Sequence, residues 1–271
     1  MSRIENKFNS LQQSAGKALI PYITAGDPDP EYTVAMMHAL VTAGADILEL
    51  GVPFSDPMAD GPVIQRASER ALSHKVSLAS VLEMVSEFRQ QDDQTPIILM
   101  GYLNPIEVMG YDVFARAAAS AGVDGLITVD MPPEEAEDYL KALYQHDLAP
   151  IFLVAPTTTD ERIKTISAAG RGFIYYVSFK GITGASHLDI SSVEKNLARI
   201  RAHTQLPVAV GFGIKDAQSA AEVSTIADAV VVGSAIIKKV EENLQSREKI
   251  VNSITALLSQ MKKAMDLRAN Q

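Results

Sequence analysis

Two carboxylates stand close together in the segment LELGVPFSDPMADGP, which covers residues 48–62. Glu49 lies in an apolar run with strand character, and a carboxyl group buried there would have a raised pKa suited to general acid–base chemistry. Asp60 follows in a loop stiffened by prolines. Taken singly, Glu49 is typical of a structural ion-pair partner and Asp60 of a turn or a helix N-cap. Together they predict an active site, because both acids flank the carboxyl end of one strand, where α/β folds place their chemistry.

Eight short apolar runs alternate along the chain with segments of helical periodicity. The runs begin at Ala18, Asp46, Pro96, Gly125, Pro150, Phe173, Pro207 and Ala229. The helical segments cover residues 32–43, 78–90, 113–121, 133–145, 160–169, 191–202 and 217–225, and one more helix is expected to begin near Pro62. This alternation is typical of a parallel sheet covered on both faces, and eight units in about 250 residues predict an α/β fold of the closed (β/α)8 TIM barrel type. An open doubly wound sheet is the alternative, but the first run continues into TAGDPDP, which lacks the glycine fingerprint of a dinucleotide site.

We expect residues 1–271 to form a single barrel domain, since no Gly/Ser-rich linker or low-complexity tract divides the chain. Two helices lie outside the repeat, an extra N-terminal helix at about 2–13 and an added C-terminal helix at about 247–266, and both should pack on the barrel.

Composition excludes several classes of function. The net charge of −9 argues against nonspecific binding to nucleic acid or to an anionic membrane. The chain has no cysteine, hence no disulfide and no thiolate metal site. Its first residues are polar, and no window approaches the roughly 20 apolar residues of a membrane span. We expect a cytoplasmic protein.

Three glycine-containing turns follow the last three predicted strands. The first is the loop SFKGITGASH at residues 178–187, and the others are GFG at 211–213 and GSA at 233–235. Turns of this kind, followed by a helix N-terminus, present backbone N–H groups and the positive end of the helix dipole to an anion. Their shared position at one end of the barrel predicts a phosphate site.

Other chemistries find little support. A Schiff-base aldolase needs a lysine at a strand end, whereas the lysines here, such as Lys17, Lys180 and Lys215, fall in helices, loops or flanks. The histidines do not cluster in the way a zinc aldolase requires, so we expect no metal site. No lysine is evident that would bind pyridoxal phosphate. The remaining mechanism is acid–base catalysis by carboxylates without a cofactor.

Residues 48–62 resemble the tryptophan synthase alpha subunit family, and the resemblance covers the barrel core and both additional helices. It implies a lyase that cleaves indole-3-glycerol phosphate by retro-aldol chemistry to indole and glyceraldehyde 3-phosphate, in tryptophan biosynthesis. Such a cleavage would use Glu49 as a shuttle that protonates indole C3 and later accepts the side-chain hydroxyl proton. Asp60 would accept a hydrogen bond from the indole N–H and stabilise its positive charge.

The resemblance also implies binding residues. Those expected around the indole and glycerol portions are Tyr22, Ile64, Tyr102, Tyr175, Thr183 and Phe212, and those expected around the phosphate are Gly184, Gly213, Gly233 and Ser234. Core packing explains Tyr175 and Phe212 equally well, because inward strand residues fill a barrel with or without a ligand. The family often has a basic residue where Phe179 stands, which leaves the contribution of that side chain to loop closure open.

The family works with a pyridoxal phosphate-dependent beta subunit that receives indole through a channel. The resemblance therefore implies an alpha2-beta2 heterotetramer and no cofactor in this chain. The loop residues Asp56, Pro57 and Met58 have no evident catalytic task and are expected to contact this partner, because surface loops on a rigid barrel often recognise other proteins.

Two other functions stay open at this point. Another phosphate-barrel enzyme, such as a ribose-phosphate isomerase or an indole-glycerol-phosphate synthase, is less well supported, since the synthase needs lysine and further acids on strands that are mainly aliphatic here. A noncatalytic regulatory or scaffolding subunit would bind a phosphate ligand without needing Glu49 and Asp60.

Overall fold

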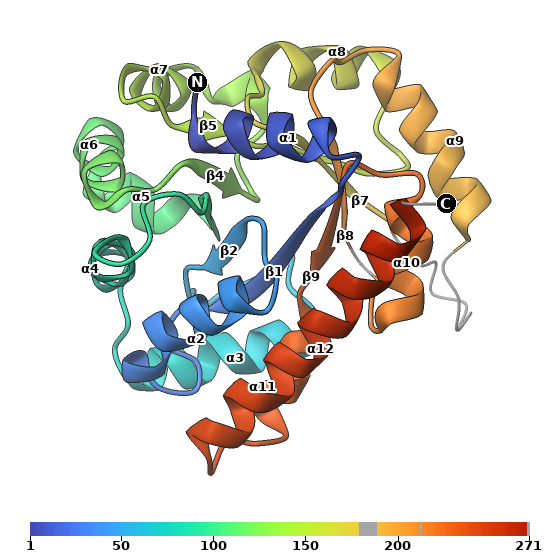
Figure 1. Cartoon of the computed structure of the whole chain (residues 1–271). Coiled ribbons are helices and arrows are strands. Elements are labelled where there is room, and N and C mark those ends of the chain that lie inside the picture. Colours follow the sequence, from blue (N-terminus) through green and yellow to red (C-terminus); the bar gives the residue numbers. More distant parts are fainter. Residues whose placement is uncertain (179–188, 212, 270–271) are drawn as a thin grey trace.

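The computed structural model describes residues 1–178, 189–211 and 213–269 (Figure 1). Nine parallel strands form one sheet in the order β5-β4-β3-β2-β1-β9-β8-β7-β6. They are β1 (Ala18–Thr24), β2 (Leu48–Gly51), β3 (Ile97–Gly101), β4 (Gly125–Thr128), β5 (Ala149–Pro150), β6 (Leu153–Val154), β7 (Ile174–Val177), β8 (Val208–Gly211) and β9 (Ala229–Val232).

The two edge strands of this sheet, β5 and β6, belong to one continuous run. Only Ile151 and Phe152 separate them, and both bond to neighbouring strands: the Ile151 amide donates to the Leu126 carbonyl at 2.8 Å, and the Phe152 carbonyl accepts from the Tyr175 amide at 3.0 Å. The chain itself therefore joins the ends of the sheet. The nine strands are the eight predicted runs, with the run beginning at Pro150 divided in two, and they curl into the predicted barrel.

Helices follow the strands and cover the outside of the sheet (Figure 1). They are α1 (Arg3–Gln13), α2 (Pro30–Thr42), α3 (Pro62–Ser73), α4 (Leu78–Arg89), α5 (Leu103–Met109), α6 (Tyr111–Ala121), α7 (Glu137–Gln145), α8 (Asp160–Ala169), α9 (Ile190–Arg201), α10 (Ala217–Ser224), α11 (Ser234–Glu241) and α12 (Arg247–Ala269), with the 3-10 helix η1 (Pro133–Glu135) before α7. The segment predicted as one helix at 133–145 is thus η1 followed by α7. The short helix α5 was not predicted. It contains Pro105 at its third position, where a proline is tolerated because the first N–H groups of a helix make no hydrogen bond within the helix. None of the helices in the described part of the chain is long and apolar enough to cross a membrane.

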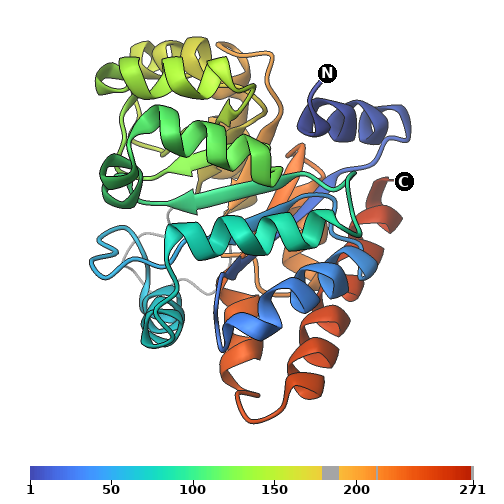
Figure 2. The same ribbon diagram turned by 90° about the vertical axis from the view of Figure 1, so that its left-hand side faces the viewer.

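The buried apolar side chains divide between the inside and the outside of the sheet. Alternate strand residues such as Ile20, Ile47 and Ile98 fill the barrel, and Ile4 and Phe8 of α1 join them from one end. The intervening residues pack against the helices; they include Leu19, Leu48, Leu50 and Leu99. This two-residue alternation directs Glu49, two residues after Ile47, into the barrel. Figure 2 shows α1 at one end and the loop between β2 and α3 at the opposite end, toward which the strand arrows point.

Ion pairs attach both additional helices to the barrel. The Arg3 guanidinium of α1 lies 3.0 Å from the Asp124 carboxylate, which also accepts from Arg89 at 2.8 Å. The Lys262 ammonium of α12 lies 2.9 Å from the Asp46 carboxylate. Because Asp46 and Asp124 come just before β2 and β4, these pairs lie at the amino-terminal end of the barrel, opposite the carboxyl ends of the strands.

Candidate active site

Glu49 lies in the middle of β2, where its Cα is in register with Tyr22 of β1 and Ile98 of β3. The residue is 1 % exposed. Its Oε2 atom is buried and has no hydrogen-bond partner among the residues that the structure describes. A buried acid is normally paired or hydrogen-bonded, so this carboxyl group is not held as a structural ion-pair partner would be.

The surroundings favour the neutral form of Glu49. Burial raises its pKa to about 8, and the nearby negative charge of Asp60 contributes to the rise. Glu49 therefore carries a proton at neutral pH and can donate it. After donation the carboxylate is a base of useful strength, since its pKa lies close to the working pH.

The same burial has a measurable cost in stability. Glu49 ionises near its ordinary value of 4.5 in the unfolded chain but only at about 8 in the folded chain. Between these values the folded chain binds more protons, so stability falls as pH rises. Glu49→Gln is therefore expected to raise the free energy of unfolding by an amount on the order of 3 to 5 kcal/mol above about pH 9, and by little near pH 4. Urea unfolding of both chains at the two pH values checks this, and an equal change at both would contradict it.

Asp60 lies in the loop before α3, which begins at Pro62 as predicted. The N-cap of α3 is Gly61, and no side chain makes a capping bond there. The interpretation of Asp60 as a helix cap is therefore wrong. The Gln65 side chain donates to the Asp60 backbone carbonyl at 2.8 Å, which holds the main chain. Burial raises the pKa of the Asp60 carboxyl above its ordinary value, and a hydrogen bond from Tyr102 offsets part of this rise. The buried Glu49 carboxyl has no such lowering interaction, so the environment of Asp60 is the more polar of the two.

Three of the predicted substrate residues line the mouth or the interior of the barrel. Tyr22 packs with Ile64 near the beginning of α3, and its hydroxyl lies 3.2 Å from the Thr24 hydroxyl. Tyr175 belongs to the side chains that fill the barrel. The pKa of each tyrosine is raised, first by burial and then by nearby groups that include Glu49. Both hydroxyls therefore keep their protons at neutral pH.

Two glycines make room for these tyrosines. A Cβ at Gly51 would lie 2.1 Å from the Tyr22 hydroxyl oxygen, and a Cβ at Gly211 would lie 2.3 Å from that of Tyr175. Each ring thus lies over a glycine at the end of the neighbouring strand. Nothing in the sequence pattern indicated these contacts, because a glycine at a strand end is equally typical of a turn.

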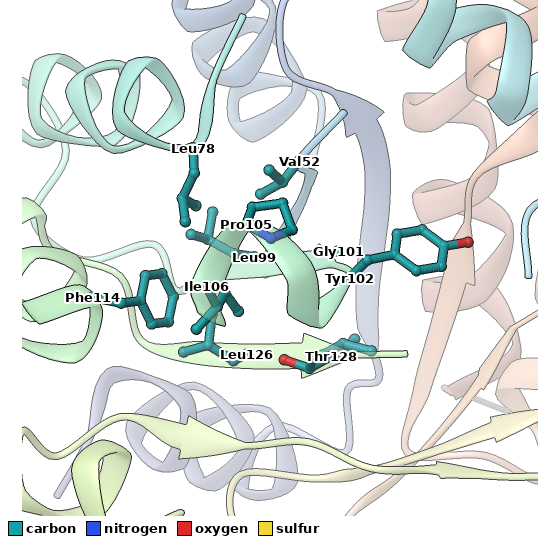
Figure 3. A pocket seen from close by; sticks show the side chains of 11 residues that line it. Val52, Leu78, Leu99, Gly101, Tyr102, Pro105, Ile106, Phe114, Leu126 and Thr128 are labelled. Atoms are coloured by element: carbon teal, nitrogen blue, oxygen red, sulfur yellow. The ribbon is translucent and has the colours of Figure 1, made fainter. Parts of the chain in front are cut away.

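Tyr102 occupies a different environment from the other predicted substrate residues. Beside it a small apolar cavity of about 10 Å³ lies among side chains that include Val52, Leu99 and Phe114. That volume holds roughly one water molecule and no organic ligand. Figure 3 shows the Tyr102 ring extending away from these side chains. Its hydroxyl accepts a hydrogen bond from the Ala59 amide at 3.0 Å.

Of the three predicted phosphate turns, the structure describes Gly211 and Gly213 of the second and all of the third, and these two turns follow the neighbouring strands β8 and β9. Gly213 has a φ of +80°, a conformation that favours glycine. Gly233 is the N-cap of α11, where no side chain makes a capping bond, and Ser234 is the exposed first residue of that helix. The structure thus brings Gly213, Gly233 and Ser234 to one end of the barrel. The predicted residues Thr183, Gly184 and Phe212 lie outside the described residues, as does Phe179.

The expected partner contacts lie on the outer part of the same loop as Asp60. Asp56 is exposed, Pro57 is half-buried and Met58 is 85 % exposed. Within the described ranges, no group of three His, Cys, Asp or Glu side chains is arranged to hold a metal ion.

A cluster of ion pairs that the sequence did not predict supports the site from outside. Arg70 of α3 donates to both carboxylate oxygens of Asp27, at 2.6 and 2.9 Å, and to Glu241 of α11 at 3.2 Å. Arg66 pairs with the same Glu241 at 2.6 Å. The cluster connects the loop after β1 to the helix that follows Asp60 and to the helix that begins with Ser234. Asp27 appeared in the sequence only as part of TAGDPDP, with no signal for its partner.

Comparisons with known proteins agree along the whole length of the chain. The sequence profile of a family described as "Tryptophan synthase alpha chain" matches residues 8–266. The tryptophan synthase alpha chain of Thioalkalivibrio sulfidiphilus is 61% identical over 266 residues, which cover 98% of this chain and 100% of that protein. The corresponding protein of Nitrosococcus oceani is 59% identical over 270 residues, 100% of both chains.

Solved structures give the same result. The crystal structure of tryptophan synthase subunit alpha from Legionella pneumophila matches with a TM-score of 0.92 and 48% identity, covering 98% of this chain and 99% of that one. An aminoacrylate-bound tryptophan synthase from M. tuberculosis matches with a TM-score of 0.87 and 37% identity, covering 98% and 100%. This chain therefore belongs to the tryptophan synthase alpha chain family, whose members are TIM-barrel lyases that cleave indole-3-glycerol phosphate to indole and glyceraldehyde 3-phosphate.

Proposed function

We propose that this chain cleaves indole-3-glycerol phosphate with Glu49 as proton shuttle and Asp60 as the group that holds the indole N–H. The observation that carries the proposal is the environment of Glu49. Its carboxyl group is buried, is neutral at neutral pH and has one oxygen without a described hydrogen-bond partner. The Asp60 carboxyl lies nearby on a more polar loop. Two carboxyl groups in such different environments supply an acid and an anion at the same pH.

The reaction then needs no further acid or base. Protonated Glu49 gives its proton to indole C3, and the positive charge that develops on the ring is stabilised by the Asp60 carboxylate at the N–H. The Glu49 carboxylate next removes the proton of the hydroxyl on the carbon attached to C3. The bond between that carbon and C3 breaks, its electron pair returns to the ring, and an aldehyde and indole are released. Glu49 ends protonated, ready for the next turnover.

The turns after β8 and β9 hold the phosphate in this proposal. The uncapped amino end of α11, with Gly233 and Ser234, offers N–H donors and a favourable dipole, and Gly213 lets the backbone approach closely. An acidic chain needs such a local site, because its overall charge repels an anion. Tyr22, Ile64 and Tyr175 would surround the indole between phosphate and carboxylates, with Thr183, Gly184 and Phe212 assigned by resemblance.

Membership of the family implies a beta subunit as partner. We extend this to an alpha2-beta2 heterotetramer in the cytoplasm, with pyridoxal phosphate confined to the beta subunit and this chain acting as one domain without a cofactor of its own. The similar M. tuberculosis structure is of tryptophan synthase in an aminoacrylate-bound form, and the single closed sheet of this chain is consistent with one domain.

Asp56→Ala tests the proposed partner surface. The side chain is exposed and its only described side-chain bond is with neighbouring Ser55, so the chain should fold and cleave substrate alone as before. Affinity for the beta subunit is expected to fall about ten-fold or more, as for an interfacial charge. Titration calorimetry with the purified beta subunit measures this. Unchanged affinity and unchanged activation by the partner would remove Asp56 from the interface.

Adding indole-3-glycerol phosphate and following indole release tests the proposed function as a whole, with and without a beta subunit. An isomerase or an indole-glycerol-phosphate synthase would release no indole. A noncatalytic phosphate-binding subunit would bind the substrate and leave it intact. Release of indole by the wild-type chain, lost in Glu49→Gln, is the expected result.

A further inference from the structure

Tyr102 lies between a strand and a helix of the barrel. It directly follows β3 and is the N-cap of α5, with a backbone conformation of φ −110° and ψ 156°. The amide of the next residue, Leu103, donates to the Asp130 carboxylate at 2.8 Å and anchors the beginning of the helix. The Tyr102 side chain is largely buried, with 5 % of the residue exposed. Its position is therefore set by the strand and the helix on either side.

The loop between β2 and α3 is far less enclosed. Most of its tip is exposed: Ser55, Asp56, Met58 and Ala59. Its own backbone bonds are short-range, from the Met58 amide to the Asp56 carbonyl at 2.9 Å and from the Asp60 amide to the Pro57 carbonyl at 3.1 Å. These bonds shape the tip. The loop is held at its start, where the Val52 amide donates to the Met100 carbonyl at 2.8 Å, and at its end, where the Gln65 side chain donates to the Asp60 carbonyl at 2.8 Å.

Between these two points, Tyr102 contacts the loop in three places. Its ring stacks on Phe54 with the ring centres 5.1 Å apart and the planes 27° apart. Its hydroxyl oxygen accepts a hydrogen bond from the Ala59 amide at 3.0 Å, and its interaction with the Asp60 carboxyl group lowers the pKa of that carboxyl. A phenol has one proton and two lone pairs, so accepting from Ala59 leaves its proton for Asp60.

We infer that Tyr102 is a positioning residue, which orients the Asp60 carboxylate toward the indole N–H and fixes the loop that carries it. The inference rests on the proposed function and gives Tyr102 a task beyond the substrate contact expected from the sequence. The bond from Ala59 sets the direction of the phenol, and the stack on Phe54 holds the first half of the loop. The Asp60 carboxylate is thus aligned before the substrate arrives. On a loop without these contacts to Tyr102, it would have to be oriented when the substrate binds.

The charges of the groups agree with this arrangement. Burial raises the pKa of Tyr102 to about 12, so the hydroxyl keeps its proton in the working range. A hydrogen bond from it stabilises ionised Asp60 and lowers a pKa that burial raises. Removing the hydroxyl should therefore raise the pKa of Asp60 and leave less of it ionised at a given pH.

Tyr102→Phe separates positioning from substrate contact. The variant keeps the ring and its stack on Phe54 but loses both hydroxyl bonds. We expect kcat for indole release to fall about ten-fold with KM changed by less than about three-fold, and the acid limb of the pH profile to move to higher pH. Tyr111→Phe is the matched control, because its hydroxyl bonds Glu107 on α5 and should leave kinetics unchanged. A rise in KM with unchanged kcat and acid limb would make Tyr102 a substrate contact only and overturn the inference.

A second measurement needs no substrate. The carboxyl carbon of Asp60 can be followed by NMR in chain labelled with ¹³C at aspartate, with Asp60→Asn to identify its resonance. The titration midpoint of Asp60 is expected at higher pH in Tyr102→Phe than in the wild type, and unchanged in Tyr111→Phe. Equal midpoints in Tyr102→Phe and the wild type would overturn the inference. Because no turnover is involved, this result stands even if the chain fails to release indole and the proposed function is wrong.

Discussion

Glu49→Gln is expected to slow cleavage of indole-3-glycerol phosphate by at least about 10²-fold, the loss typical of a general acid–base group. The substitution keeps the size of the side chain in a site that is 1 % exposed. The amide can neither give a proton to indole C3 nor remove one from the hydroxyl, so both proton transfers lose their catalyst. Since the neutral amide resembles the protonated acid, KM should change little and the loss should fall on kcat.

Indole release under saturating substrate measures this loss. Glu83→Gln, the same change at an exposed position of α4, is the control and should keep wild-type activity. The accompanying gain in stability above about pH 9 shows that the variant is folded. Retention of more than about a tenth of the wild-type rate would remove Glu49 from the role of shuttle.

Arg70→Met is expected to destabilise the chain by on the order of 3 to 5 kcal/mol at neutral pH, the cost of breaking a buried ion pair from one side. The Asp27 side chain is fully buried, and Arg70 donates to both of its oxygens. Without the guanidinium, Asp27 must either remain charged in an apolar setting or take up a proton. Burial raises its pKa and Arg70 lowers it, so the variant should recover stability in acid, where Asp27 is protonated.

Urea unfolding at neutral and acid pH measures the effect. Adding Asp27→Asn to Arg70→Met removes the uncompensated charge and should restore a large part of the lost stability. Arg66→Met is the surface control, since Arg66 pairs with the same Glu241 in contact with solvent and should have little effect. Equal losses from Arg66→Met and Arg70→Met, or no recovery in the double variant, would contradict a buried pair at Asp27.

The parts of the fold that follow from local pattern were predictable. Apolar strands alternating with helices indicated the barrel, and the two-residue alternation through Ile47 and Glu49 indicated a carboxyl group pointing into it. The division of one run into β5 and β6 was not predictable. It depends on how residues 149–154 meet β4 on one side and β7 on the other, which is a tertiary contact.

In the candidate site, too, the features that depend on tertiary contacts could not be predicted from local pattern. The spacing of Glu49 and Asp60 suggested a pair, but a local pattern also suggested a capping role for Asp60 that Gly61 fills in the structure. The contacts of Tyr102 with Ala59 and of Arg70 with Asp27 join residues 43 apart in the sequence. Neither follows any local periodicity. Propensity and spacing can therefore identify the two acids as candidates. The residues that set their position and pKa are found only in the folded chain.

The proton on Glu49 is tested most directly by the pH dependence of kcat/KM for indole release by the wild-type chain, from about pH 6 to about pH 10. The reaction begins with a proton on Glu49, and burial and the charge of Asp60 place the pKa of that carboxyl at about 8 in the free chain. We expect a basic limb centred near that value, with kcat/KM falling ten-fold for each further pH unit. If kcat/KM instead stays constant around pH 8 and declines only near pH 10, protonated Glu49 is not the acid that starts the cleavage.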